Sequence, residues 1–247
     1  MQPQDQKQAE KLDEKAVIES LKSFRLKRLR LWGDSVLRHF NWLDNQPLDS
    51  CVPRRYSRWR LWDFSEGAAC RSLRFLDPDS SSAAPSTLYL QGDIGTGKTS
   101  LAAATLHAWW FSGGGCCKEC PSVYACLVEK PEGGLFLPAY EAAARLRDLE
   151  KCDEAMNLWS TTRLLILDDL GANRSTPHVT EQLLFLLQSR YDECRKTIVT
   201  SNLSLDALAV ALGDRAASRL QEGILVELTG GDRRGRAATV LWCSNRR

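Results

Sequence analysis

The residues best suited to chemistry form a glycine-rich loop in the first half of the chain. The sequence Gly92-Asp-Ile-Gly-Thr-Gly-Lys-Thr99 follows a short apolar stretch and runs into an alanine-rich helical segment. In a Gly-x-x-x-x-Gly-Lys-Thr loop between a strand and a helix, the glycines let successive backbone N–H groups point at phosphates. Lys98 is placed to reach the β and γ oxygens of a nucleotide, and Thr99 to bind Mg²⁺.

This pattern predicts a nucleotide-binding P-loop, with ATP and Mg²⁺ as the expected cofactors. The residues expected to contact the nucleotide are Gly92, Asp93, Ile94, Gly95, Thr96, Gly97, Lys98, Thr99 and Ser100. The helix that follows the loop presents the positive end of its dipole to the phosphates.

A pair of carboxylates further along the chain completes the expected metal and water site. Asp168 and Asp169 end the apolar run Arg163-Leu-Leu-Ile-Leu-Asp-Asp169. One carboxylate at such a position holds Mg²⁺ together with Thr99, and the next orients the attacking water. Adjacent residues on a strand point to opposite faces, so we expect the chain to bend at Leu170-Gly171 to bring both carboxylates to one site.

Two further groups of polar residues are candidates for the same chemistry. Thr200-Ser201-Asn202 ends the next strand, where its side chains are expected to reach the γ-phosphate or its water. Arg215 and Arg219 stand four residues apart on a predicted helix and therefore share one face. Their spacing fits a solvated stripe, and it also fits an arginine presented to the nucleotide of a neighbouring subunit.

Strands and helices alternate through this part of the chain. Besides the strand before the P-loop, strands are expected at 135–137, 163–169, 197–201 and 224–228, and helices at about 139–150, 179–194 and 205–220. This alternation predicts an α/β fold, a parallel sheet with helices on both faces. Residues 12–44 have helical spacing, whereas 48–76 are expected to be less regular.

Composition and length are those of a globular protein. The 247 residues are 43% hydrophobic and 26% charged, with a formal net charge of +2. The N-terminus has no apolar signal region, and no stretch approaches the roughly 20 apolar residues that span a bilayer. The sequence therefore predicts a cytoplasmic protein with no membrane contact.

These motifs, in this order, resemble the helicase-loader and transposition-helper branch of the AAA+ ATPases, the DnaC and IstB families. The resemblance covers residues 88–234 and is carried by the P-loop, by Leu-Leu-Ile-Leu-Asp-Asp-Leu-Gly, by Ser-Arg-Tyr before Thr-Ile-Val-Thr-Ser-Asn-Leu, and by Gly-Asp-Arg-Ala-Ala-Ser-Arg-Leu. It implies these roles: Asp168 and Asp169 as the Walker B pair, Asn202 as the sensor-1 residue, Arg219 as the arginine finger, Arg215 as a supporting arginine, and Arg234 near the nucleotide.

The resemblance also implies an organisation. We expect an N-terminal helical partner-binding module (1–46), a basic and aromatic linker segment (47–86), and an AAA+ ATPase domain (87–247). Asp169 stands where many AAA+ proteins carry Glu, and its shorter side chain predicts slow hydrolysis. Little sequence follows Arg234, so no separate helical lid domain is expected.

The expected function is that of an ATP-dependent ATPase that assembles as a ring or filament on DNA or on a replicative helicase and loads or recruits it. An alternative is a transposition helper that assembles on duplex DNA and serves a transposase. A third reading is a nucleotide-gated adaptor with little turnover. The segment 54–62 interleaves arginines with aromatic residues, which fits either stacking on exposed bases or packing against the ATPase core.

A cysteine-rich insertion is expected at 113–134. Cys117 and Cys120 have the spacing of half a zinc site, which Cys116 and Cys126 would have to complete. There is no second Cys-x-x-Cys, and the adjacent cysteines make tetrahedral closure awkward. The alternative is a surface loop with reduced thiols, which the pattern favours over zinc.

Overall fold

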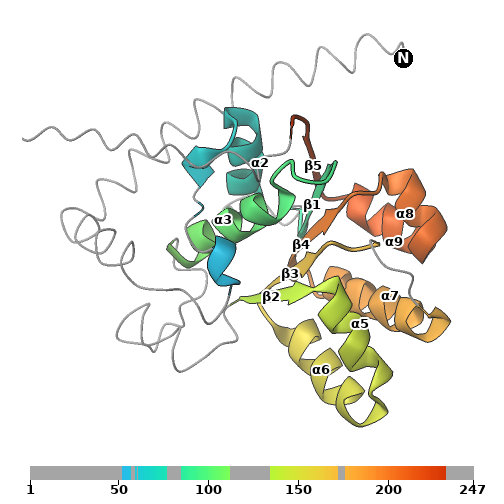
Figure 1. Ribbon diagram of the computed structural model, residues 1–247. Helices are drawn as coiled ribbons and strands as arrows, with labels where there is room; N and C mark the ends of the chain where they lie inside the picture. The colour runs from blue at the N-terminus through green and yellow to red at the C-terminus, as the bar shows by residue number, and fades with distance from the viewer. Residues whose placement is uncertain are drawn as a thin grey trace, which may run out of the picture.

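A five-stranded sheet forms the middle layer of the protein (Figure 1). The computed structural model describes residues 52–56, 59, 61–76, 85–111, 134–171 and 176–231. The strands are β1 (Thr87–Gly92), β2 (Leu135–Pro138), β3 (Leu164–Asp168), β4 (Lys196–Ser201) and β5 (Ile224–Leu228). They lie in the order β2-β3-β4-β1-β5, and every neighbouring pair is parallel. The predicted α/β fold with a parallel sheet is confirmed.

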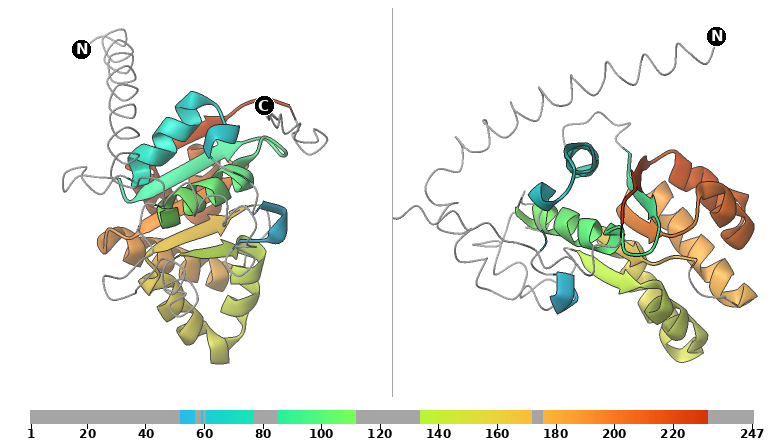
Figure 2. Two further views of the ribbon diagram at one scale, coloured as in Figure 1. Left: turned by 90° about the vertical axis from the view of Figure 1, so that its left-hand side faces the viewer. Right: turned by 45° about the horizontal axis from the view of Figure 1, so that its top comes forward.

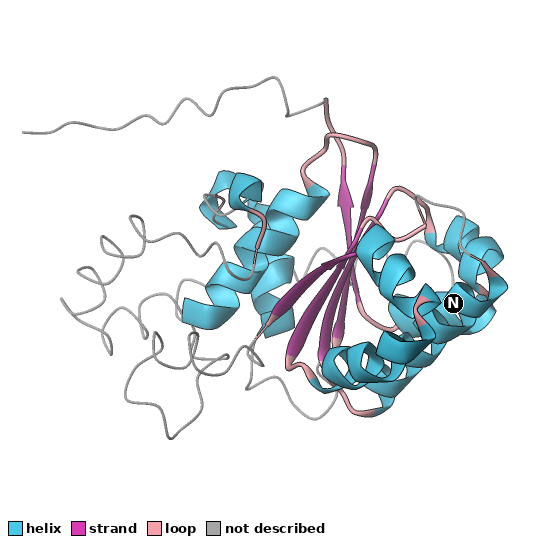
Figure 3. Cartoon of the chain, turned by 60° about the horizontal axis from the view of Figure 1, so that its bottom comes forward, coloured by secondary structure: helices cyan, strands magenta, loops and turns pink. Residues whose placement is uncertain are grey.

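Helices cover both faces of this sheet (Figures 2 and 3). One face carries α2 (Glu66–Leu76) and α3 (Lys98–Phe111), with the 3-10 turns η1 (Arg54–Tyr56) and η2 (Leu61–Asp63). The other face carries α5 (Ala139–Arg147), α6 (Leu149–Thr161), α7 (Pro177–Asp192), α8 (Leu205–Leu212) and α9 (Asp214–Gln221). None of the helices in the described ranges is long and apolar enough to cross a bilayer.

Alternate residues of each central strand supply two separate cores. In β1, Leu88 and Leu90 pack with α2 and α3, whereas Tyr89 packs with the helices of the opposite face. The residues of β3 and β4 alternate in the same way. Successive side chains of a strand point to opposite faces, so a strand covered on both sides must be apolar throughout. This requirement explains the continuous apolar runs before each polar strand end.

One predicted helix ends early and is followed by a helix that extends well beyond the predicted range, and another predicted helix is divided in two. The helix expected at 139–150 stops at Arg147, and the Asp148 side chain accepts a hydrogen bond from Glu150 N at 3.3 Å to begin α6. The helix expected at 205–220 is divided at Gly213, whose φ of +99° glycine adopts without a steric penalty. Local capping residues therefore override the helical periodicity at both points.

The segment expected to be irregular, 48–76, contains an eleven-residue helix, α2. Ala68 and Phe75 of this helix are buried in the same core as the P-loop strand. Tyr56 and Trp59 lie half-buried against that core, and Arg55 is exposed beside the Tyr56 ring. For these two aromatic side chains, the structure favours core packing over base stacking. Residues 1–51 lie outside the described part of the chain.

A buried arginine, Arg190, connects the C-terminal ends of α6 and α7 with the amino ends of β3 and β4. Arg190 is fully buried, and its guanidinium donates to the carbonyls of Trp159, Thr162 and Lys196 at 2.6–2.8 Å. Its Nε also donates to Thr197 Oγ1 at 2.9 Å. Burial, with a smaller contribution from another arginine, lowers the pKa of Arg190 to about 9, which leaves it cationic at neutral pH. Arg190 thus donates hydrogen bonds to carbonyl groups at the C-terminal end of α6, which have no partner within α6.

Replacing Arg190 with methionine should destabilise the fold. The substitution keeps an apolar stem but leaves several buried carbonyls without donors, so we expect the free energy of unfolding to fall by about 3 kcal/mol. Urea denaturation measures this. Arg195→Met is the control, because Arg195 donates to Thr161 O at an exposed position and its loss should cost about 0.5 kcal/mol. Equal losses in the two variants would contradict the role given to Arg190.

Candidate nucleotide-binding site

The P-loop, the acidic pair and Asn202 meet at the carboxyl edge of the sheet. The pairing aligns Leu167 of β3 with Val199 of β4, and Leu90 of β1 with Thr200 of β4. Strands β3, β4 and β1 therefore end side by side. The P-loop continues from β1, the acidic pair from β3, and Asn202 from β4.

The P-loop takes a conformation that depends on its glycines. Gly92, Gly95 and Gly97 have φ values of +153°, +85° and +101°, which side-chain-bearing residues rarely adopt. A Cβ on Gly92 would lie 2.2 Å from the carbonyl oxygen of Leu228, at the end of β5. The first glycine of the loop is therefore also required by the neighbouring strand.

Lys98 closes the loop on itself. Its Nζ donates to the carbonyls of Gly92 and Asp93, each at 2.8 Å, and the side chain is almost fully buried. Thr96 Oγ1 donates to Asp93 O at 2.8 Å and holds the same turn. The ammonium group is thus fixed inside the curve of the loop, where the phosphates of a nucleotide would lie. Ile94, at the tip, is 64% exposed.

Asp168 connects the P-loop helix to the neighbouring strand. Thr99 Oγ1 donates to its Oδ2 at 3.3 Å, and Thr200 Oγ1 donates to its Oδ1 at 2.7 Å. Burial, and to a lesser extent Asp169, raises the pKa of Asp168, although the bonds from both threonines act in the opposite direction. A hydroxyl and a carboxylate so close together form a donor set of the oxygen type that Mg²⁺ prefers. Thr99 and Asp168 therefore fit the expected metal-binding role.

The chain turns over residues 169–171, so the bend expected at Leu170-Gly171 is present and begins at Asp169. Asp169 has a φ of +61°, and its N–H donates to Thr200 Oγ1 at 2.8 Å. Its carboxylate is exposed, and its Oδ1 lies 3.5 Å from Nδ2 of Asn202. The bend places both carboxylates at the same edge of the sheet. Asp169 and Asn202 form its solvent-facing part, where a water molecule can approach.

The side chains of Thr200 and Ser201 do not face the position of the phosphate or its water, contrary to the expectation from the sequence. Both are fully buried. Ser201 Oγ donates to Leu170 O at 2.6 Å and accepts from Leu203 N at 3.0 Å, so it joins the acidic loop to the loop after β4. These two side chains position the acidic pair and Asn202 instead of facing a ligand.

The sequence analysis did not single out Tyr89 as part of this framework. Its hydroxyl donates to the carbonyl of Leu203 at 2.8 Å from inside the core. An aromatic residue that carries a hydroxyl, within an otherwise aliphatic buried strand, is the signal that would have indicated a buried polar partner.

Arg215 and Arg219 do not join the P-loop. Arg219 lines a hollow of about 490 Å³ together with Ser86 and Thr87, at the amino end of β1. The six residues of β1 separate that end from the P-loop by about 17 Å. Arg215 is exposed on α9. Arg234 and the four candidate zinc ligands, Cys116, Cys117, Cys120 and Cys126, lie outside the described residues.

This chain is similar to several proteins whose names refer to DNA replication. No protein-family model matches the sequence. Over 125 residues, 49% of this chain, it is 29% identical to the replicative helicase loader DnaI of Bacillus subtilis (strain 168). The match spans only 34% of that protein's length.

Solved structures that share the fold include a helicase loader and a replication initiator. The DnaC helicase loader matches 71% of this chain and 99% of its own, with a TM-score of 0.54 and 24% identity. AMPPCP-bound DnaA from Aquifex aeolicus matches 70% of this chain and 50% of its own, with a TM-score of 0.55 and 21% identity. The core is therefore an AAA+ P-loop fold, and the resemblance to the helicase-loader branch, drawn from the motifs, is confirmed.

Thr200→Val should weaken both the fold and the metal-binding site. The substitution keeps the shape but removes the hydroxyl that joins Asp168 to the Asp169 backbone, so the free energy of unfolding should fall by about 1–3 kcal/mol. Mg²⁺-dependent affinity for an ATP analogue should fall by about tenfold or more. Thr200→Ser keeps the hydroxyl and should behave like the wild type in urea denaturation and in nucleotide titration. Equal behaviour of the two variants would contradict the positioning role.

Asp168→Asn should separate metal binding from folding stability. Because the fold raises the pKa of Asp168, ionisation of this carboxyl is less favourable in the folded than in the unfolded chain. The neutral variant should therefore be the more stable of the two at pH 8 without nucleotide, and its advantage should shrink as the pH falls towards the ordinary pKa. Urea denaturation at pH 8 and pH 5 measures this difference. Addition of Mg²⁺ and nucleotide should stabilise the wild type more than the variant, which keeps the P-loop and Lys98. Equal stabilisation of the two proteins would count against Asp168 as a metal ligand.

Proposed function

We propose that this chain, whose core is similar in sequence and fold to the helicase loaders DnaI and DnaC, is an ATP-dependent ATPase that loads or recruits a replicative helicase. In this proposal it binds ATP and Mg²⁺ at the P-loop and works as a homo-oligomer in contact with DNA. The single observation that carries the proposal is the convergence of Lys98, Thr99, Asp168, Asp169 and Asn202 on one edge of the sheet.

The chemistry of this site is electrostatic. Phosphoryl transfer gains little from covalent participation by the protein, so positioned charges supply the catalysis. Lys98 is held where it would compensate the charge of the β- and γ-phosphates. Thr99 and Asp168 would hold Mg²⁺, which would supply further positive charge to the same site. Asp169 and Asn202 are exposed and lie within 3.5 Å of each other, and in this proposal they orient a water molecule for attack once that contact loosens.

The position of Arg219 supports dependence on assembly. An arginine side chain extends about 7 Å from its Cα, and Arg219 is separated from the P-loop of its own chain by the length of β1. Arg219 therefore cannot reach a nucleotide bound to its own subunit. A second copy that docks its nucleotide edge on this end of the sheet would bring a γ-phosphate to Arg219, which makes hydrolysis depend on the oligomer.

A nucleotide-gated adaptor with little turnover is the second candidate function. The observation that favours it is the short side chain of Asp169, whose Oδ1 is 3.5 Å from the Asn202 amide at the exposed end of the site. This contact would have to loosen before the carboxylate orients a water molecule. Binding of ATP without its consumption would then change the shape or assembly of the chain.

The first test is ATP hydrolysis measured against protein concentration, with no DNA, with single-stranded DNA and with duplex DNA. A helicase loader should show a cooperative dependence on protein concentration and stimulation by single strands. Stimulation by duplex DNA alone would favour a transposition helper that serves a transposase. Tight ATP binding with no turnover under any condition would favour the adaptor.

Lys98→Ala should abolish ATP binding, because no other described cation lies inside the loop to take its place. Calorimetric titration with a non-hydrolysable ATP analogue measures this loss. Lys151→Ala is the matched control, since Lys151 pairs with Asp148 on the exposed surface of α6 and its loss should leave the affinity unchanged. Retained affinity in the Lys98 variant would disprove the site.

Mixtures of two inactive variants test whether Arg219 acts on a neighbouring subunit. Arg219→Ala keeps the P-loop and should bind ATP but lose assembly-dependent hydrolysis. Lys98→Ala should fail to bind ATP yet still present Arg219. Mixing them should restore part of the activity, because one variant supplies the nucleotide and the other the arginine. No recovery over a range of ratios, with both variants folded and still assembling, would count against action in trans.

A further inference from the structure

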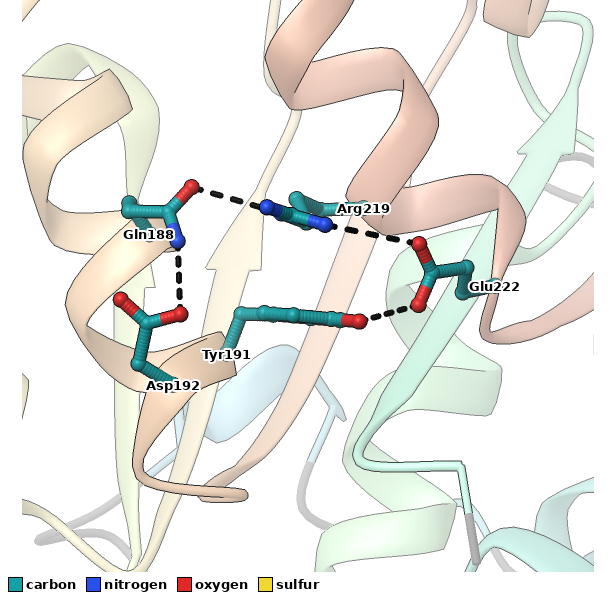
Figure 4. A network of polar contacts seen from close by, with 5 residues as sticks. All are labelled: Gln188, Tyr191, Asp192, Arg219 and Glu222. Carbon is teal, nitrogen blue, oxygen red and sulfur yellow. Dashed lines mark hydrogen bonds and ion pairs between the residues drawn. The ribbon is translucent and has the colours of Figure 1, made fainter. Parts of the chain in front are cut away.

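Arg219 is held by a small polar network at the amino edge of the sheet (Figure 4). Its guanidinium stacks over the ring of Tyr191, 4.4 Å from the ring centroid. Its Nη1 lies 3.5 Å from Oε1 of Glu222, and its Nε donates to Oε1 of Gln188 at 3.4 Å. The Tyr191 hydroxyl donates to Oε2 of Glu222. Both oxygens of the Glu222 carboxylate are therefore engaged, one with Arg219 and one with Tyr191.

The members of this network come from two packed helices. Gln188 and Tyr191 lie on the last turns of α7, Arg219 lies on the last turn of α9, and Glu222 ends α9. Gln188 also donates to Asp192 at 2.7 Å, which fixes the amide whose oxygen faces the guanidinium. The backbone of the network is therefore helical or directly follows a helix. Only the side chains have to move for Arg219 to change partner.

The charge of the neighbouring hollow opposes entry of an anion. Among the described residues that line it, the ionised side chains are two carboxylates, Asp192 and Glu222, and one guanidinium, Arg219. The hollow is therefore net negative while Glu222 stays in place. A phosphate that approaches Arg219 would compete with the Glu222 carboxylate for guanidinium donors, because Nη1 of Arg219 lies 3.5 Å from Oε1 of Glu222.

We propose that Glu222 and Tyr191 are positioning residues that set when Arg219 becomes available to the nucleoside triphosphate of a second copy of this chain. This inference rests on the proposed function. Glu222 occupies the place that the incoming γ-phosphate takes and so raises the protein concentration needed for assembly-dependent hydrolysis. Tyr191 holds the guanidinium plane in position after the carboxylate has been displaced.

The ion pair between Arg219 and Glu222 restrains the arginine only moderately. The Arg219 and Glu222 side chains are 37% and 51% exposed, so their ion pair is worth little in water. An incoming triphosphate with several negative charges can therefore displace Glu222 without a large barrier. We expect the ion pair to raise the protein concentration needed for assembly-dependent hydrolysis a few-fold. It is too weak to prevent assembly.

The experiment compares hydrolysis against protein concentration for Glu222→Gln and the wild type. The amide keeps the size of the side chain but no longer competes as an anion, so the concentration at half-maximal rate should fall about two- to fivefold. The maximal rate per subunit should stay the same. Glu193→Gln is the matched control, because it removes an exposed charge near the end of α7 that does not line the hollow, and its curve should coincide with the wild type.

Two further variants separate positioning from a general structural effect. Tyr191→Ala removes the ring under the guanidinium and should lower the maximal rate several-fold, whereas Tyr191→Phe keeps the ring and should retain that rate. In an Arg219→Ala background, Glu222→Gln should leave the half-maximal concentration unchanged, because the carboxylate then has no arginine to restrain. A fall in the half-maximal concentration that persists in that background would overturn the proposal.

Failure of this inference can be told apart from failure of the proposed function. If wild-type turnover does not depend on protein concentration, or if Arg219→Ala leaves it unchanged, the proposed function is wrong and this inference is overturned with it. If both of those dependences hold but Glu222→Gln leaves the half-maximal concentration unchanged or raises it, only the role of Glu222 is wrong.

Discussion

The parallel pairing of β3, β4 and β1 is the constraint on which the rest of the structure depends. It makes three strands end at the same level, so that residues distant in the sequence become neighbours at one edge. Thr200 shows how closely the strand ends are tied, because its hydroxyl contacts both Asp168 and the Asp169 backbone. Without this alignment the P-loop helix and the acidic pair could not contact the same ligand.

A continuous apolar interior makes this pairing stable, and it also confines polar chemistry to the strand ends. Helices cover both faces of the central strands, so a polar side chain within a strand would be buried without a partner. Buried polar residues of the strands have partners: Tyr89 of β1 donates to the Leu203 carbonyl, and Thr197 of β4 accepts a hydrogen bond from Arg190 of α7. Each of these bonds strengthens a connection between elements instead of weakening the core.

The two edges of the sheet carry opposite parts of the proposed mechanism. The carboxyl edge gathers the loop, the metal-binding oxygens and the water-orienting pair. The amino edge presents Arg219 on a Tyr191 platform beside a carboxylate. Because the length of β1 separates the edges, one molecule cannot bring both to the same phosphate. Two copies stacked edge to edge would join them, which is the physical basis for the proposed coupling of hydrolysis to assembly.

The sequence by itself determined where the strands lie along the chain, and it also identified the P-loop and the acidic pair. Buried parallel strands and phosphate-binding loops each require a pattern of residues within one short segment, so the sequence shows them directly. It was less successful at the breaks at Asp148 and Gly213 and at α2, where a cap or a tertiary contact outweighs periodicity. Only the tertiary structure decided that Thr200 faces inward and that Arg219 lies far from its own P-loop. Those properties follow from the register between strands and from the packing of α9 on α7, which bring together residues that no local pattern relates.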